Sequence, residues 1–141
     1  LVSTLDIVIG QRLVRALTDT KVPYTLTKDE LAQLEKLADM DRLLEALKTE
    51  KVIKADDTWT KIKFWKPTPG PDDDGYKGRV GIHEVLKMSP AIRDLVMKSS
   101  TTADMEVQAR KEGMLTMLED GIFQCVQGLT TIEEVLRVVS E

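Results

Sequence analysis

Few side chains in this 141-residue sequence have types and spacings that could do chemistry. The chain contains one histidine, His83, and one cysteine, Cys125. One imidazole cannot build a metal site of two or three histidines, and no Ser-His-Asp set is well supported. His83 lies in the apolar alternation of a predicted strand and Cys125 on an apolar helical stripe, so we expect a structural histidine and a buried, inert thiol. The sequence therefore assigns no catalytic residue and no metal ligand.

A glycine-rich segment is the strongest candidate for contact with a ligand. Gly75, Gly78 and Gly81 recur at every third residue around Tyr76 and Arg79. Glycines let the backbone approach a flat ligand, and a guanidinium group can stack on that ligand or donate hydrogen bonds to it. The spacing is neither a dinucleotide-binding fingerprint nor a phosphate-binding loop, because no GxxxxGK(S/T) occurs. The residues alone leave two interpretations open, a ligand-contacting loop and a tight turn into a strand.

The composition excludes several classes of partner. Twenty basic and twenty-four acidic residues give a formal net charge of −4. We therefore expect no nucleic-acid partner, because binding to phosphates depends on an excess of basic side chains. No apolar run approaches the roughly 18 to 20 residues that cross a bilayer, so no membrane insertion is predicted. The chain has no initiator methionine and begins within a predicted element, which suggests a fragment of a larger protein.

The elements that must position the glycine-rich segment begin with a helix and a strand. Leu5, Val8 and Ile9 lie on one side of a helix predicted over residues 1–10, and residues 11–17 alternate polar and apolar side chains as in a short strand. The first twenty residues are therefore predicted to form the end of a helix, a short strand and the start of a connection.

Residues 21–75 predict a helical and loop region. Thr27 and Glu30 have the spacing of a capping box, and a second apolar series follows Asp39, so this part is either a helical hairpin or one bent helix. The aromatic residues of 59–65 indicate a satellite core beneath a loop, with a docking patch for a partner as the alternative. Three prolines and two glycines within residues 66–75 then exclude a regular element.

Residues 76–141 predict a strand followed by four short helices. The strand spans residues 79–88, and Ser89-Pro90 is typical of a helix start. Thr130 with Glu133, or Thr131 with Glu134, offers two registers for the start of the last helix. We expect an α+β fold that is mostly α, with the four helices in a compact bundle.

Four segments of the chain, taken in order, resemble a known family. They are QRLVRAL at residues 11–17, GYKGRVGIHEVL at residues 75–86, GMLTMLEDG at residues 113–121 and GLTTIEEVLRV at residues 128–138. Together they resemble the C-terminal part of the ATPases of type II secretion and type IV pilus assembly. Residues 21–74 carry little of the resemblance.

The resemblance implies a hexameric cytoplasmic motor that hydrolyses ATP with Mg²⁺ and acts on a platform protein of the inner membrane. The chain would then hold short strands from the edge of a RecA-like core (residues 1–20), a variable insertion (21–75), and the signature strand with a C-terminal helical subdomain (76–141). In relatives the phosphate-binding loop and the acidic Mg²⁺ residues lie upstream, so we expect this piece to be inactive alone.

The resemblance also implies site residues and one departure. It places Arg79, with Gly78, Gly81 and Tyr76, on the adenine and ribose side of the nucleotide. It makes Arg12 and Arg15 weaker candidates for contacts with the nucleotide or a neighbouring subunit; these six residues are the whole predicted site. Relatives commonly carry two CxxC pairs near residues 18–21 and 68–71, where this chain has no cysteine. We therefore expect no zinc, and we expect apolar packing within 31–47 and 59–65 to replace it.

A second class of function stays open at this point. The chain could be a non-enzymatic adaptor or protein-interaction domain that shares the fold. A GxxxxGK(S/T) segment upstream of residue 1 would decide for the motor, and its absence would decide for the adaptor.

Overall fold

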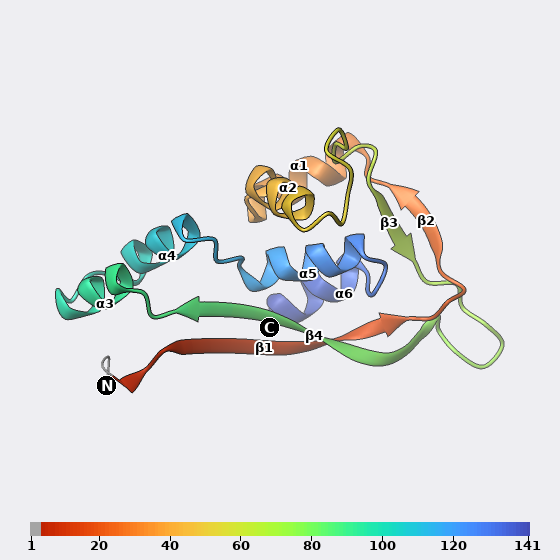
Figure 1. Cartoon of the computed structure of the whole chain (residues 1–141). Coiled ribbons are helices and arrows are strands. Elements are labelled where there is room, and N and C mark those ends of the chain that lie inside the picture. The colour runs from red at the N-terminus through yellow and green to blue at the C-terminus, as the bar shows by residue number, and fades with distance from the viewer. Residues whose placement is uncertain (1–3) are drawn as a thin grey trace.

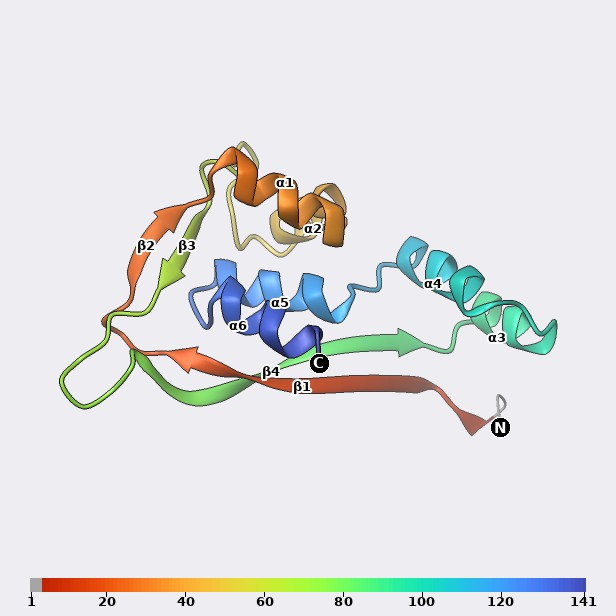
Figure 2. The ribbon, with the colours of Figure 1, turned by 180° about the vertical axis from the view of Figure 1, so that it is seen from behind.

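A long two-stranded antiparallel sheet of β1 (Ile7–Leu17) and β4 (Tyr76–Lys87) forms the base of the fold. We call this pair of strands the β1–β4 hairpin, although an insertion separates them in sequence. The computed structural model describes residues 4–141. The register pairs Ile7 with Lys87 and Arg15 with Arg79, and it shifts at a bulge between Arg15 and Leu17. Figures 1 and 2 show that the helices lie on one side of this hairpin.

The helix predicted over residues 1–10 is wrong from Ile7 onward, and its first three residues lie outside the described part of the chain. Three consecutive β-branched residues, Ile7, Val8 and Ile9, favour an extended backbone because their stiff side chains crowd a helical turn. Pairing with the far end of β4 then extends the predicted short strand to eleven residues.

The insertion between the two long strands is a helical hairpin carried on a small sheet. β2 (Val22–Thr25) pairs antiparallel with β3 (Lys63–Lys66), and α1 (Lys28–Leu37) and α2 (Met40–Thr49) lie between them in sequence. The predicted capping box of Thr27 and Glu30 is present, and Asp39 caps α2, so the hairpin interpretation is confirmed over the single bent helix.

The four predicted C-terminal helices are all present, but they form two pairs. α3 (Pro90–Met97) packs with α4 (Thr102–Lys111), and α5 (Met117–Val126) packs with α6 (Ile132–Val139). Figure 1 shows the first pair beyond the end of the hairpin and the second pair above its middle. The single compact bundle is therefore a wrong prediction, because the link at Gly113, which has a φ of +96°, separates the pairs. The α+β class is confirmed.

The core lies in the layer of α5 and α6, between the hairpin and the insertion (Figures 1 and 2). Val14 and Ile82 on the hairpin and Ile122 and Val135 on the helices are fully buried there. Residues of the insertion share this core: Leu34, Met40, Leu43, Leu47, Trp59 and Phe64. The satellite core predicted around the aromatic residues is thus continuous with the main one. Among residues 4–141, no helix has the length and apolar content needed to cross a bilayer.

Candidate functional site

The β1–β4 hairpin presents two faces of opposite character. Val14 and Ile82 point into the core, whereas a Cβ atom placed on Gly81 would meet the side chains of Gln11 and His83. Because side chains alternate along a strand, Arg79 shares the face of Gly81 and His83. We call this second face the open face, because no described element covers it in Figure 1 or Figure 2.

Exposed apolar side chains dominate the open face. Leu13 is 45% exposed, opposite Gly81, and Ile9 is 61% exposed, opposite Val85. Strips of large apolar side chains on a sheet face are seldom left to water in a finished protein. The open face is therefore a candidate surface for a ligand or for further protein.

Arg79 stands at one end of the open face with no partner. Its side chain is exposed, and among residues 4–141 no carboxylate lies within ion-pair distance of it. The residue directly across the hairpin is another arginine, Arg15. Like charges at directly opposed strand positions repel, so at least one of the two needs an anionic partner.

Arg15 is the arginine of this pair that the fold neutralises. Its Nη2 lies 3.0 Å from Oε2 of Glu134, and its Nη1 lies 2.7 Å from Oδ2 of Asp74. Its guanidinium also lies 4.2 Å above the centre of the Tyr76 ring. These contacts draw Arg15 toward α6 and leave Arg79 as the free cation of the pair.

Glu134 is a buried acid on α6 that forms ion pairs with Arg15 and Arg137. One of its oxygens accepts a hydrogen bond of 2.8 Å from the backbone N–H of Arg15, and Arg137 donates two hydrogen bonds of 3.0 Å to the carboxylate. Burial alone would raise the pKa of Glu134, but the hydrogen bonds from Arg137 and Arg15 outweigh it and lower the pKa to about 2.

The lowered pKa of Glu134 predicts an acid-sensitive contribution to stability. A carboxyl group with a depressed folded-state pKa stabilises the fold fully above its usual value of 4.5, and that contribution is lost as the pH falls toward 2. We expect Glu134→Gln to lower the free energy of unfolding by about 2 kcal/mol at pH 7 and to flatten its pH dependence between pH 4.5 and 2. Urea titrations across that range measure both effects, and an unchanged slope would contradict the assignment.

The other predicted site residues occupy different surroundings. Tyr76 is committed to the core side, because its hydroxyl hydrogen-bonds Oγ1 of Thr131 at 2.9 Å. Gly78 has a φ of +75°, which favours glycine, and no atom lies within 4 Å of where a Cβ would be, so its backbone is open. Arg12 lies beside the C-terminal residue Glu141, 3.9 Å from Oε2. The structure thus brings Arg79, Gly78 and Gly81 to accessible positions and ties Tyr76 and Arg15 to α6.

Two residues of the open face were missed by the sequence analysis, Gln11 and Leu13. Their place beside Gly81 depends on the register of β1 against β4, which joins residues about seventy positions apart. The alternation of residues 11–17 was the available signal, since it puts Gln11, Leu13 and Arg15 on one face.

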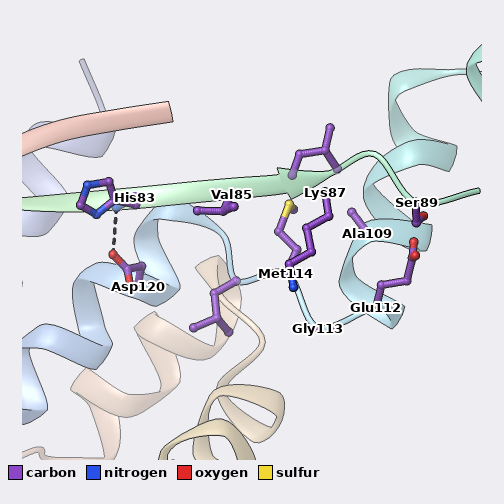
Figure 3. Close-up of a pocket in the computed structure, with 11 residues that line it drawn as sticks. His83, Val85, Lys87, Ser89, Ala109, Glu112, Gly113, Met114 and Asp120 are labelled. Atoms are coloured by element: carbon purple, nitrogen blue, oxygen red, sulfur yellow. Dashed lines mark hydrogen bonds between the residues drawn. The ribbon is translucent and has the colours of Figure 1, made fainter. Parts of the chain in front are cut away.

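A further cavity lies toward the other end of the hairpin. It encloses about 360 Å³ between the end of β4, the C-terminal turn of α4 and the start of α5 (Figure 3). Its charged groups, Lys87, Glu112 and Asp120, come from three elements and do not converge. Asp120 accepts a 2.8 Å hydrogen bond from the backbone N–H of His83, which lies four residues, or about 13 Å of strand, from Arg79. The cavity therefore lies away from Arg79, although His83, one of its lining residues, reaches the position of Gly81.

The expected burial of Cys125 is confirmed. Its side chain is buried in the core, and this burial raises the pKa of the thiol far above its ordinary value. Within residues 4–141, no cluster of three His, Cys, Asp or Glu side chains is arranged to hold a metal ion.

The insertion is held to α5 by a buried ion pair. Glu119 is fully buried and pairs with the guanidinium of Arg42 on α2. Its other oxygen accepts a 2.9 Å hydrogen bond from the backbone N–H of Asp39, the cap of α2. A polar contact therefore adds to the apolar packing that we expected to take the place of zinc.

Comparison with known proteins places the chain among secretion proteins. Residues 1–137 match the model of the family described as Type II/IV secretion system protein. The chain is 34% identical over its whole length to the type II secretion system protein E of Xanthomonas campestris pv. campestris, of which it spans 22%. It is 32% identical over 95% of its length to the type II secretion system ATPase E of Vibrio cholerae, spanning 23% of that protein. Over 48% of the chain it is 43% identical to the type IV pilus assembly ATPase PilB of Pseudomonas aeruginosa, spanning 12% of it. The chain thus spans less than a quarter of the length of these relatives.

Proposed function

Because the chain belongs to the Type II/IV secretion system protein family, we propose that it is the C-terminal region of an ATPase that powers type IV pilus assembly or type II secretion. Its part in that enzyme is to supply the adenine and ribose side of the nucleotide site. The observation that carries this proposal is Arg79, an exposed cation that has no ion-pair partner among residues 4–141 and lies at the end of a partly apolar sheet face.

The chemistry of the open face suits the nucleoside part of ATP. A planar base is apolar on its faces, which fits Leu13, and the guanidinium of Arg79 can stack on the base or donate to ribose and phosphate oxygens. Gly78 leaves the backbone beside Arg79 free of side chains, since no atom lies within 4 Å of where its Cβ would be. The role of Tyr76 would be indirect, because its ring packs against the guanidinium of Arg15. Contacts of Arg15 and Arg12 with a nucleotide or a neighbouring subunit would be secondary to those of Arg79.

The proposal divides the work between this chain and the rest of a full-length ATPase. The β- and γ-phosphates and Mg²⁺ would be held by a phosphate-binding loop and acidic residues outside residues 1–141, since the chain contains no GxxxxGK(S/T). The exposed Ile7, Ile9 and Val85 would be covered by a RecA-like core, of which residues 1–20 would form the edge.

The same proposal sets the cellular context. The full-length protein would be a hexamer in the cytoplasm, bound at the inner membrane through a platform protein of the pilus or secretion machine. Residues 21–75 would take the place of the zinc-binding region of relatives, and their docking on α5 through Arg42 and Glu119 supports that placement.

Arg79→Ala in the full-length protein tests the proposed site. We expect the apparent KM for ATP to rise about tenfold, because one charge-assisted contact to the nucleotide is worth roughly 1.5 kcal/mol. Lys63→Ala, which removes an exposed cation from β3, is the matched control and should leave the KM unchanged. Circular dichroism should show both variants folded. An Arg79→Ala enzyme that behaves like the Lys63→Ala control would refute the nucleotide-wall role, and a full-length protein without ATP hydrolysis would favour the adaptor.

A further inference from the structure

We infer that Gln11 reads the edge of the nucleotide base and makes the site select adenine over guanine. The inference rests on the proposed function, and it adds a residue that determines specificity.

The position of Gln11 is set by the hairpin register. Gln11 lies opposite His83, and its Nε2 is 2.7 Å from where a Cβ of Gly81 would be. The imidazole of His83 lies 3.0 Å from the same point, so the two side chains meet above Gly81. A Cβ atom at position 81 would come too close to the amide and displace it.

The amide of Gln11 is free to bind a ligand. Its side chain is exposed and makes no hydrogen bond within residues 4–141, although the Gly81 carbonyl beneath it is fixed by a 2.6 Å hydrogen bond from Gln124 on α5. The Gly81 backbone is therefore fixed, and the Gln11 amide beside it has a free donor and a free acceptor. Specific recognition of a flat ligand needs such a combination of fixed backbone and available polar groups.

The spacing along the open face matches the order of groups in a nucleoside. Leu13 lies between Gln11 and Arg15 on β1, and Arg79 lies opposite Arg15. Two residues of a strand span about 6.6 Å, so the distance along the strand from Gln11 to Arg15, which is opposite Arg79, is roughly 13 Å. The Gln11 amide reaches toward Leu13, because it lies beside Gly81, the residue opposite Leu13. A base over Leu13 would present its edge to Gln11 and its ribose to Arg79.

The amide distinguishes the two purines by its pattern of donor and acceptor. A glutamine can accept from the N6 amino group of adenine while donating to N7, whereas guanine presents two acceptors, O6 and N7, at that edge. One good bidentate pair of this kind separates the bases by roughly 1–3 kcal/mol, which corresponds to about 5- to 150-fold.

Steady-state hydrolysis of ATP and of GTP by the full-length protein tests the inference. We expect Gln11→Ala to lower the ratio of kcat/KM for ATP over GTP at least fivefold, chiefly through a loss with ATP. Gln11→Asn, which keeps the amide but shortens its reach, should give an intermediate ratio. Gln33→Ala, which removes an exposed glutamine from α1, is the matched control and should leave the ratio unchanged.

The outcomes separate this inference from the proposal beneath it. An unchanged ratio in Gln11→Ala, with Arg79→Ala still weakening both nucleotides, would overturn the role of Gln11 and keep the site. Equal losses with ATP and GTP in Gln11→Ala would also overturn it, because they show a structural effect and no base readout. A normal KM for both nucleotides in Arg79→Ala would instead refute the proposed site itself.

Discussion

Replacing Glu119 by alanine is expected to lower the free energy of unfolding of the chain by about 4 kcal/mol, the largest single effect that the structure predicts. The fully buried carboxylate accepts from the guanidinium of Arg42 and from the backbone N–H groups of Asp39 and Thr116. Its removal strands a partly buried positive charge and two donors, and leaving such groups unpaired in the interior is more costly than losing an exposed ion pair.

Thermal unfolding measures this effect, with an expected fall in Tm of about 10 °C. Glu106→Ala removes an exposed glutamate from α4 and should change the stability by less than about 0.5 kcal/mol. Arg42→Ala combined with Glu119→Ala should destabilise by less than the sum of the two single changes, because the double variant no longer contains an unpaired charge. A Glu119→Ala protein as stable as Glu106→Ala would show that the insertion is not held through this pair.

The local elements could be read from the sequence because their causes are local. The Thr27–Glu30 capping box and the Ser89-Pro90 helix start are signals contained within a few residues, and both occur in the structure. Where two registers were open for the last helix, Thr131 became the cap. Thr130 instead donates a 2.7 Å hydrogen bond to the carbonyl of Arg15, a residue 115 positions away.

The arrangement of those elements could not be read in the same way. The strand over Ile7–Gly10 depends on partners in 84–87, and a helical pattern of apolar residues was available at the same positions. The division of the four helices into two pairs depends on which of them reach the hairpin, and helix periodicity carries no such information. Pairing between distant segments therefore overrode the local pattern.

The site shows the same division between local and distant causes. Of the three glycines around Arg79, only Gly78 has open space where a Cβ would be, because Gly75 and Gly81 are covered by other residues. That Arg15 is neutralised while Arg79 is free could not be known, since it depends on Glu134, 119 residues from Arg15. The stronger candidate, Arg79, and the weaker candidate, Arg15, thus differ in the structure, because the fold gives Arg15 its counter-ions.

Gly121→Ala is expected to destabilise the chain by about 2 kcal/mol, although alanine is the better helix former. Gly121 lies on α5 where α6 crosses it, and an added Cβ would overlap Cγ1 of Val135 and lie 2.9 Å from its Cγ2. Val135 is fully buried, so it cannot turn away without displacing α6 from the core. The overlap therefore outweighs the gain in helix propensity of about 1 kcal/mol.

A double-mutant cycle separates this steric cause from any other role of the glycine. Val135→Ala alone should cost about 2 kcal/mol by leaving a cavity, but Gly121→Ala together with Val135→Ala should cost less than the sum, since the new methyl group occupies that space. Gly10→Ala is the control, because its nearest atom, Cε of Met117, lies 3.5 Å away and the change should be nearly neutral. If the losses in unfolding free energy, measured with urea, were additive, the contact between α5 and α6 would not be what excludes a larger residue at position 121. The close packing of these two helices would then need another explanation.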